Sequence, residues 1–361
     1  MSNVETESTL NGTFSKCNVV MWIKTMRLQT ALVTSLTLWA GYISVSPLNI
    51  KSALLIGVIG VAYHIFGFTL NEVKDREYDA TIGNGSKHPI ADGKVSPLTA
   101  RKVAWGSYFL AILISLVSNF RAVGTIVLIL SVIPAYAYNN YSKTHWWSNI
   151  YLSTWASMMV VTGSLYAGTP TNITWVVVGI IAIQIFVQVM QGDLKDLTGA
   201  EESVCRTLGV DLSTADEYVN YKTDIEMPSE DPIIGDNTVI TYTNVFTVFI
   251  YLLKFTQLGL LIFIPYTFWE AGSNFSIMYT AIFFFSVITF VTTLSGFMVL
   301  VYNRDKIKKY SSMHELTNIA LLGLALYPIH QYSSLLIIAA PISWFILTNK
   351  IIHSGSLNPD V

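Results

Sequence analysis

Apolar runs long enough to cross a lipid bilayer recur along the chain and limit the folds open to it. A membrane-spanning helix needs about 20 consecutive apolar residues. Such runs begin near Arg27, Ser52, Val103, Ala122, Asn149, Ile173, Asn244 and Phe275. Two shorter apolar stretches, 316–329 and 333–347, close the chain. Charged residues make up only 12% of the sequence, about half the share of a soluble domain. The sequence therefore predicts an all-α polytopic membrane helix bundle of about nine transmembrane helices, with ten as the alternative.

The segments outside these runs set the expected domain boundaries. Residues 1–20 are polar and match neither a signal peptide nor an Arg-rich transit peptide, so we expect a disordered tail. Residues 21–350 form a single transmembrane domain in this interpretation, and residues 351–361 form a C-terminal tail. Within the domain, 211–238 is a long acidic loop without an apolar period, a composition that favours disorder.

Basic residues are distributed unevenly between the two sides of the predicted membrane. Most of the 21 Lys and Arg residues fall on the side of the N-terminus. Cytoplasmic loops carry an excess of Lys and Arg, so we expect an integral multi-pass membrane protein whose N-terminus and long loops are cytoplasmic. Loops on the far side are short, which indicates that the chemistry takes place on the cytoplasmic side. The net charge of -2 gives no indication of a nucleic-acid partner.

A polar stretch, residues 71–79, follows directly on an uncharged run that ends at Leu70. In an α-helix Asn71, Asp75 and Asp79 lie at i, i+4 and i+8 and therefore share one face. Carboxylate and amide oxygens are the ligands that hard cations such as Mg²⁺ prefer, often together with substrate phosphates. The spacing predicts a metal-binding stripe at the end of a membrane helix. The alternative interpretation is a polar helix end at the membrane surface.

A second acidic pair follows the sixth apolar run. Asp193 and Asp196 share a helix face at i and i+3, on the same predicted side of the membrane as the first cluster. The cationic residues near the two clusters are Arg76, Lys87, Lys143, Lys195 and Arg206. Metal ions together with Lys and Arg form a receptor for a diphosphate, because the metal bridges carboxylate and phosphate oxygens and the cations neutralise the remaining charge.

These motifs resemble the signatures of the UbiA superfamily of intramembrane prenyltransferases. The first signature is similar to Asn71-x-x-x-Asp75-Arg76-x-x-Asp79 followed by Lys87-His88-Pro89-Ile90-x-x-Gly93-Lys94-Val95-Ser96. The second resembles Asp193-x-x-Asp196-x-x-Gly199 with Arg206-Thr207-Leu208 behind it. Between them, Tyr138 or Tyr141 with Lys143 is similar to the family's Tyr/Lys element, and Arg27 stands where the first helix opens with an Arg. The resemblance covers roughly residues 26–210.

The chain departs from the family pattern at a few positions. Glu72 replaces an Asp, and His88 replaces an Arg. Ala200 stands in the place of the final Asp of the second motif. Glu201 or Glu202 is left to supply that acid, from positions turned by about 100° and about 200° around a helix. Whether either residue does so stays open.

The resemblance implies a helical bundle with a cap of cytoplasmic helices and loops over a Mg²⁺-diphosphate site. It implies metal binding by Asn71, Asp75, Asp79, Asp193 and Asp196. The same four aspartates and Lys143 are the expected catalytic residues, and the five cations named above are the expected diphosphate contacts. The implied partners are a prenyl diphosphate donor, a hydrophobic or aromatic acceptor, and membrane lipids.

Three other functions remain open. A terpene cyclase on the same fold needs no acceptor, because a double bond of the substrate attacks the cation, and the altered second motif and His88 are compatible with it. A transporter usually places ionisable groups near the bilayer midplane on discontinuous or repeated helices, which this sequence does not indicate. A lipid-binding relative without activity follows if Ala200 has removed the second metal.

Several polar residues lie inside the predicted spans. The candidates for the cavity lining are His64, Tyr138, Tyr141 and Gln188. His64 lies seven positions before Asn71, and its alternative role is hydrogen-bonded helix packing. Lys254 is close enough to the end of its span for its ammonium group to snorkel to the surface, so it is left out of the site.

Overall fold

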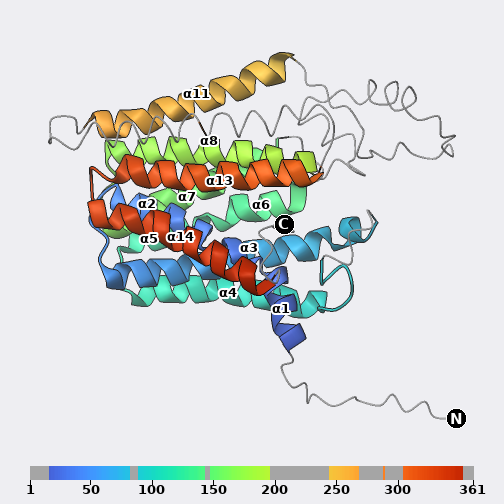
Figure 1. The fold of residues 1–361 in the computed structure, drawn as a ribbon. Coiled ribbons are helices and arrows are strands. Elements are labelled where there is room, and N and C mark those ends of the chain that lie inside the picture. Colours follow the sequence, from blue (N-terminus) through green and yellow to red (C-terminus); the bar gives the residue numbers. More distant parts are fainter. Residues whose placement is uncertain are drawn as a thin grey trace, which may run out of the picture.

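The computed structural model describes residues 16–81, 88–142, 147–195, 244–267 and 304–352, together with residue 288 alone. All regular structure in this part of the chain is helical, as predicted (Figure 1). The helices are α1 (Lys16–Thr25), η1 (Leu28–Thr30), α2 (Ala31–Ile43), α3 (Ile50–Thr81), α4 (Pro97–Val117), α5 (Ala122–Leu130), α6 (Val132–Tyr141), α7 (Asn149–Ala167), α8 (Asn172–Lys195), α11 (Asn244–Tyr266), α13 (Arg304–Leu326) and α14 (Gln331–Ile352).

The predicted apolar runs coincide with these helices. Within the described ranges, six segments are long and apolar enough to cross a membrane: Ile50–Glu77, Pro97–Val117, Ala122–Tyr141, Asn172–Gly192, Asn244–Ile264 and Gln331–Thr348. The two short closing stretches belong to separate helices, α13 and α14, which pack against each other. The run near Phe275 lies outside the described residues, so the count of about nine transmembrane helices stays a prediction.

The first helix begins earlier than the predicted domain boundary at residue 21. Helix α1 starts at Lys16, so it extends into the segment predicted as a tail, and the domain boundaries stay a prediction. The physical reason is packing, because Met21 and Trp22 contact an apolar cluster that includes Val73 and Ile90. Burial of these side chains offsets the cost of ordering the helix. Residues 1–15, the acidic loop 211–238 and residues 353–361 lie outside the described part of the chain.

Helices α2 and α7 approach each other closely at two glycines. A Cβ atom added to Gly41 would lie 1.9 Å from the carbonyl oxygen of Val160, and one added to Gly163 would lie 1.9 Å from that of Leu38. Small residues allow two helix backbones to approach closely where the lipid gives no hydrophobic driving force. The two glycines therefore set the distance between α2 and α7 at the centre of the core.

Several helices run in opposite directions through the bundle, which brings polar segments of the chain together at one end. The carboxyl ends of α3, α6 and α8 and the amino end of α4 gather at one end of the bundle, on the right in Figure 1, where α1 also lies. The first acidic cluster lies on α3, and α8, which finishes at this end too, carries Asp193 of the second cluster in its last turn. The fold thus places Asp193 on the same side of the bundle as the first cluster, although about 120 residues separate them in sequence.

Candidate functional site

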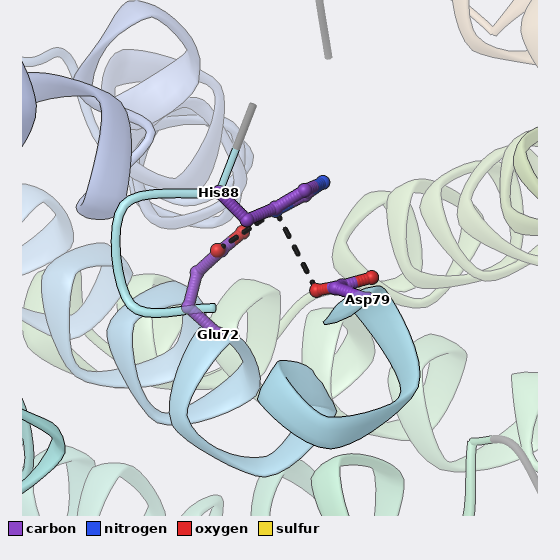
Figure 2. A group of neighbouring side chains, drawn as sticks. All are labelled: Glu72, Asp79 and His88. Atoms are coloured by element: carbon purple, nitrogen blue, oxygen red, sulfur yellow. Dashed lines mark hydrogen bonds and ion pairs between the residues drawn. The ribbon is translucent and has the colours of Figure 1, made fainter. Parts of the chain in front are cut away.

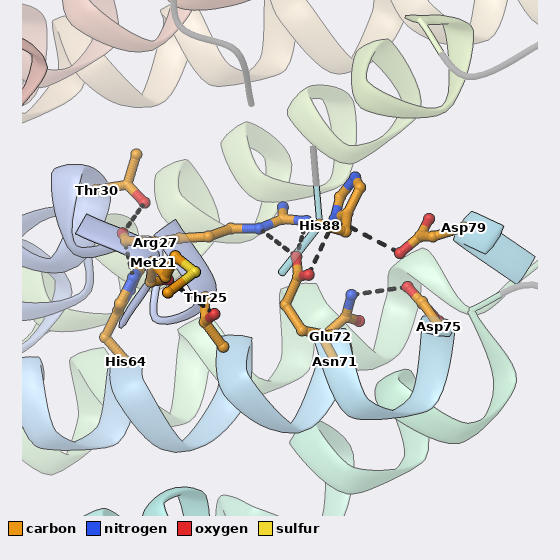
Figure 3. A network of polar contacts seen from close by, with 10 residues as sticks. All are labelled: Met21, Thr25, Arg27, Thr30, His64, Asn71, Glu72, Asp75, Asp79 and His88. Carbon is orange, nitrogen blue, oxygen red and sulfur yellow. Dashed lines mark hydrogen bonds and ion pairs between the residues drawn. The ribbon is translucent and has the colours of Figure 1, made fainter. Parts of the chain in front are cut away.

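Helix α3 carries the first acidic cluster at its carboxyl end. The helix is 32 residues long and continues without a break from its apolar part into residues 71–79. The Asn71 amide donates a hydrogen bond from Nδ2 to Asp75 Oδ2 over 2.8 Å (Figure 3). Asp75 and Asp79 are each only 9% exposed. The predicted stripe therefore consists of buried acids in helical register, and the interpretation as a solvated helix end does not fit this burial.

Glu72 is the most buried acid of the cluster, at 3% exposure. Its Oε1 atom accepts two hydrogen bonds from the Arg27 guanidinium, from Nη2 over 2.8 Å and from Nε over 3.1 Å. Its Oε2 atom accepts a hydrogen bond from His88 Nδ1 over 2.9 Å (Figures 2 and 3). Glu72 thus joins α3 to the end of α1 and to the segment that follows residue 87.

His88 also approaches the last acid of the stripe. Its Nδ1 atom lies 3.6 Å from Asp79 Oδ2, and Figure 2 shows the imidazole between the two carboxylates. The segment 88–96 is folded tightly, with Gly93 at a φ of 71° and with the Lys94 amide donating to the Pro89 carbonyl. Ile90 and Val95 pack on Val73 of α3. This segment therefore covers the end of α3 and brings an imidazole to its acids.

Arg27 is held in an unusual backbone conformation beside the cluster. Its φ of 46° and ψ of 44° are left-handed, which is costly for a residue other than glycine. The Arg27 carbonyl accepts a hydrogen bond from His64 Nε2 over 2.9 Å. The other ring nitrogen of His64 accepts from Thr34 Oγ1 over 2.9 Å, and the ring is 1% exposed. Both nitrogens of His64 are used inside the protein, which favours its helix-packing role over contact with a substrate.

The remaining predicted site residues divide into two groups. In the described part, Arg76 turns outward and pairs with the exposed Glu77 over 2.9 Å, Tyr141 is 43% exposed, and Tyr138 and Gln188 are half-buried. Asp193 and Lys195 lie in the last turn of α8, whose backbone alone is described at these positions. Lys87, Lys143, Asp196 and Arg206, as well as Ala200, Glu201 and Glu202, fall outside the described residues.

Glu72 and Arg27 form an ion pair beside the acidic stripe that the sequence did not predict. Glu72 appeared only as a mild replacement in a motif, and Arg27 only as the opening residue of a helix. The sequence did contain a signal for Glu72, because Glu72 and Asp79 are seven residues apart and so lie on nearly the same helix face. Its partner Arg27, between α1 and η1, lies 45 residues away in sequence, and helical periodicity gives no information about such a distant contact.

We expect Glu72→Ala to lower the free energy of unfolding by about 3 kcal/mol, because it leaves the Arg27 guanidinium without its carboxylate partner. This value is at the low end for a buried pair, since the Arg27 side chain keeps 22% exposure. Thermal unfolding of the protein in detergent measures the effect. Glu77→Ala is the matched control. The Glu77 side chain is 83% exposed and pairs with the exposed Arg76, so the melting temperature of this variant should not change. Equal melting temperatures for both variants would contradict the proposed importance of the Glu72 contacts.

The donor atoms at the end of α3 are suited to a hard divalent cation. Carboxylates come from Asp75 and Asp79, and the bond from Asn71 Nδ2 to Asp75 uses the amide nitrogen and not the amide oxygen. Single donor atoms of Glu72, Asp79 and His88 also lie within 4.8 Å of one another. Oxygen-rich sets of this kind match the coordination of Mg²⁺. Buried carboxylates this close together repel one another unless a cation lies nearby.

The sequence pattern of the UbiA prenyltransferase family matches residues 30–319 of this chain. The match covers most of the 361 residues. The chain therefore belongs to the UbiA prenyltransferase family, which confirms the resemblance seen in its motifs.

Individual relatives are more distant. The chain is 28% identical over 130 residues to 4-hydroxybenzoate octaprenyltransferase of Histophilus somni (strain 2336), a match that covers 35% of this chain and 45% of that protein. It thus spans less than half the length of this relative. A UbiA homologue from Aeropyrum pernix K1 has the same fold, with a TM-score of 0.58 and 12% identity over 82% of this chain and 97% of the homologue. A UbiA homologue from Archaeoglobus fulgidus, solved with GPP and Mg²⁺, gives a TM-score of 0.53 and 15% identity over 84% and 99%.

Proposed function

We propose that this protein is a Mg²⁺-dependent prenyltransferase that ionises a prenyl diphosphate and transfers the prenyl group to a hydrophobic or aromatic acceptor within the membrane. The observation that carries the proposal is the row of Asn71, Asp75 and Asp79 along the end of α3, with both acids 9% exposed. Buried carboxylates are costly unless positive charge lies near them, and a bound cation would supply such charge. Mg²⁺ and GPP occupy the homologue from Archaeoglobus fulgidus.

The proposed metal ligands are Asn71, Asp75, Asp79, Asp193 and Asp196. When bound, Mg²⁺ neutralises charge on the diphosphate and so favours its departure as a leaving group. The protein's own part is to hold these oxygen donors at one end of the bundle and to exclude water from the carbocation. Support for Asp193 comes from the fold, because α3 and α8 end on the same side (Figure 1).

The proposed diphosphate contacts are cations next to the two acidic clusters: Arg76, Lys87, Lys143, Lys195 and Arg206. Arg76 is bonded to Glu77, a pair in which both side chains are exposed. Exposed ion pairs contribute only about 0–1 kcal/mol, so little free energy opposes a turn of Arg76 toward a bound diphosphate. Arg27 is proposed to have a different role, because Glu72 already uses two of its donors.

The membrane position fits the chemistry of such a substrate. A prenyl chain partitions into an apolar environment, whereas its diphosphate needs cations and hydrogen-bond donors. A polar site at one end of an apolar bundle meets both requirements. We propose that this end, with the N-terminus, faces the cytoplasm, in accordance with the distribution of Lys and Arg among the loops.

Product analysis separates transfer from cyclisation, the alternative on the same fold. We expect purified protein with Mg²⁺ and labelled geranyl, farnesyl or geranylgeranyl diphosphate to give a prenylated product only when a panel of hydrophobic or aromatic acceptors is added. A cyclised hydrocarbon or alcohol formed from the diphosphate alone would identify a terpene cyclase instead. Coupled uptake by proteoliposomes without turnover of any diphosphate would favour a transporter.

A further inference from the structure

Six buried polar side chains connect α8, α11 and α13 inside the bundle, away from the acids of α3. The residues are Gln184 and Gln191 of α8, Lys254 and Gln257 of α11, and His314 and Asn318 of α13. Lys254, Gln257 and His314 are 0% exposed, and the other three are 7% exposed or less. The sequence-based prediction that Lys254 snorkels to the surface is therefore wrong.

Lys254 is bonded on two sides within this network. Its Nζ atom donates to Gln257 Oε1 over 2.5 Å and to His314 Nε2 over 2.8 Å. The other ring nitrogen, His314 Nδ1, lies 2.8 Å from Gln191 Oε1. Because an amide oxygen only accepts, the ring proton sits on Nδ1 and leaves Nε2 as the acceptor for Lys254. A continuous chain of bonds thus runs from α11 through α13 to α8.

A second branch reaches α8 two turns earlier. Gln257 Nε2 donates to Gln184 Oε1 over 3.0 Å and to Asn318 Oδ1 over 3.3 Å. Gln184 and Gln191 are seven residues apart, so they lie on nearly the same face of α8. The helix is therefore held at two points, Gln184 at its middle and Gln191 about one turn before its carboxyl end.

This arrangement is a costly way to pack three helices. No acidic side chain is among the hydrogen-bond partners of Lys254 in the described part of the chain. A buried amine without a counter-ion costs several kcal/mol, and apolar residues of similar size are often as stable or more stable. The best-attested benefit of such groups is that they fix the register of one helix against another.

Register matters on α8 because the second acidic cluster begins there. Position 193 lies two residues beyond Gln191, about 3 Å further along the axis and about 200° around it. A slip of one residue would turn this position by about 100°. We propose that Lys254, His314 and Gln191 are positioning residues that lock the register of α8, so that its end is held for metal binding. The inference rests on the proposed function of Asp193 as a ligand.

The test compares stability with metal affinity. Lys254→Met alone leaves His314 Nε2 and Gln257 Oε1 unpaired, so its melting temperature should fall. A sixfold variant replaces the whole network and leaves none of its members without a partner. It combines Lys254→Met with Gln184→Leu, Gln191→Leu, Gln257→Leu, His314→Leu and Asn318→Leu, and it should regain the wild-type melting temperature or exceed it. Its affinity for Mn²⁺, measured by EPR titration with geranyl thiodiphosphate present, should still be about tenfold weaker, as for other residues that orient metal ligands.

A matched control comes from the opposite end of the bundle. Ser115 is bonded there to Thr125 over 2.7 Å and to Tyr166 over 2.5 Å, also between buried side chains of three helices. The variant Ser115→Ala with Thr125→Val and Tyr166→Phe removes this network without touching α8. Its Mn²⁺ affinity should equal that of the wild type.

Wild-type Mn²⁺ affinity in the sixfold variant would overturn the register lock. A parallel loss of stability and affinity would overturn it too, because destabilisation alone explains that result. A wild-type protein that binds Mn²⁺ but releases no diphosphate refutes the proposed function alone, because the EPR titration does not depend on turnover. Absence of Mn²⁺ binding in the wild type refutes both.

Discussion

Asp75→Asn is expected to reduce prenyl diphosphate turnover by about 10³-fold, the size of effect seen when one stabilising group for a developing charge is lost. Asp75 lies at the centre of the stripe, one turn from both Asn71 and Asp79, and is 9% exposed. The substitution keeps the shape of the side chain and an oxygen that accepts from Asn71 Nδ2. It removes the negative charge that a divalent cation needs. The variant should therefore fold normally, and steady-state release of diphosphate measures the loss.

Glu77→Gln provides the comparison on the same helix. Glu77 is two residues further along, is 83% exposed in its side chain and points away from the stripe toward Arg76. The variant loses the same unit of charge at almost the same depth, so general electrostatics at this end of the bundle change equally. Its turnover should stay within about twofold of the wild type. Equal losses in the two variants would show that Asp75 has no particular role.

Gly41→Ala should prevent the bundle from folding correctly. The new Cβ atom would lie 1.9 Å from the Val160 carbonyl oxygen, and this neighbour is backbone, which cannot move aside as a side chain does. Separating α2 from α7 would lower the free energy of unfolding by at least about 3 kcal/mol. Size-exclusion profiles and melting temperatures in detergent would show the loss, and Gly163→Ala should behave alike because it meets the Leu38 carbonyl oxygen at the same distance.

The control for this prediction is Gly106→Ala on α4, where nothing lies within 4 Å of the added Cβ atom. This change should leave stability unchanged or raise it by about 0.5–1 kcal/mol, because alanine favours a helix more than glycine does. A Gly41→Ala variant as stable as Gly106→Ala would mean that α2 and α7 are not packed as described.

The sequence predicted those features that depend on neighbouring residues. The apolar runs became helices, since a helix satisfies its own backbone hydrogen bonds inside a bilayer. The spacing of Asn71, Asp75 and Asp79 predicted one shared face, and the bond between Asn71 and Asp75 agrees with it. The roles of these residues in metal binding stay predictions.

The features that the sequence did not predict depend on contacts between distant segments. Glu72 bonds to Arg27 across 45 residues, and Lys254 bonds to His314 across 60. A lysine near the end of an apolar run is predicted to snorkel when its neighbours are unknown. For an isolated amine, reaching the membrane surface costs less free energy than burial in the interior. Only the packing of α11 on α13 reveals that His314 and Gln257 satisfy Lys254 in the interior.

The central claim is that the acids on α3 form, together with a divalent cation, a site that ionises a prenyl diphosphate. The most direct test is release of diphosphate from labelled prenyl diphosphates of several lengths by purified protein, with Mg²⁺ present or removed by a chelator, compared with Asp75→Ala and Asp193→Ala. We predict release that requires Mg²⁺ and is lost in both variants. Release that persists without Mg²⁺ or in Asp75→Ala, or no release from any donor with any acceptor, would contradict the claim.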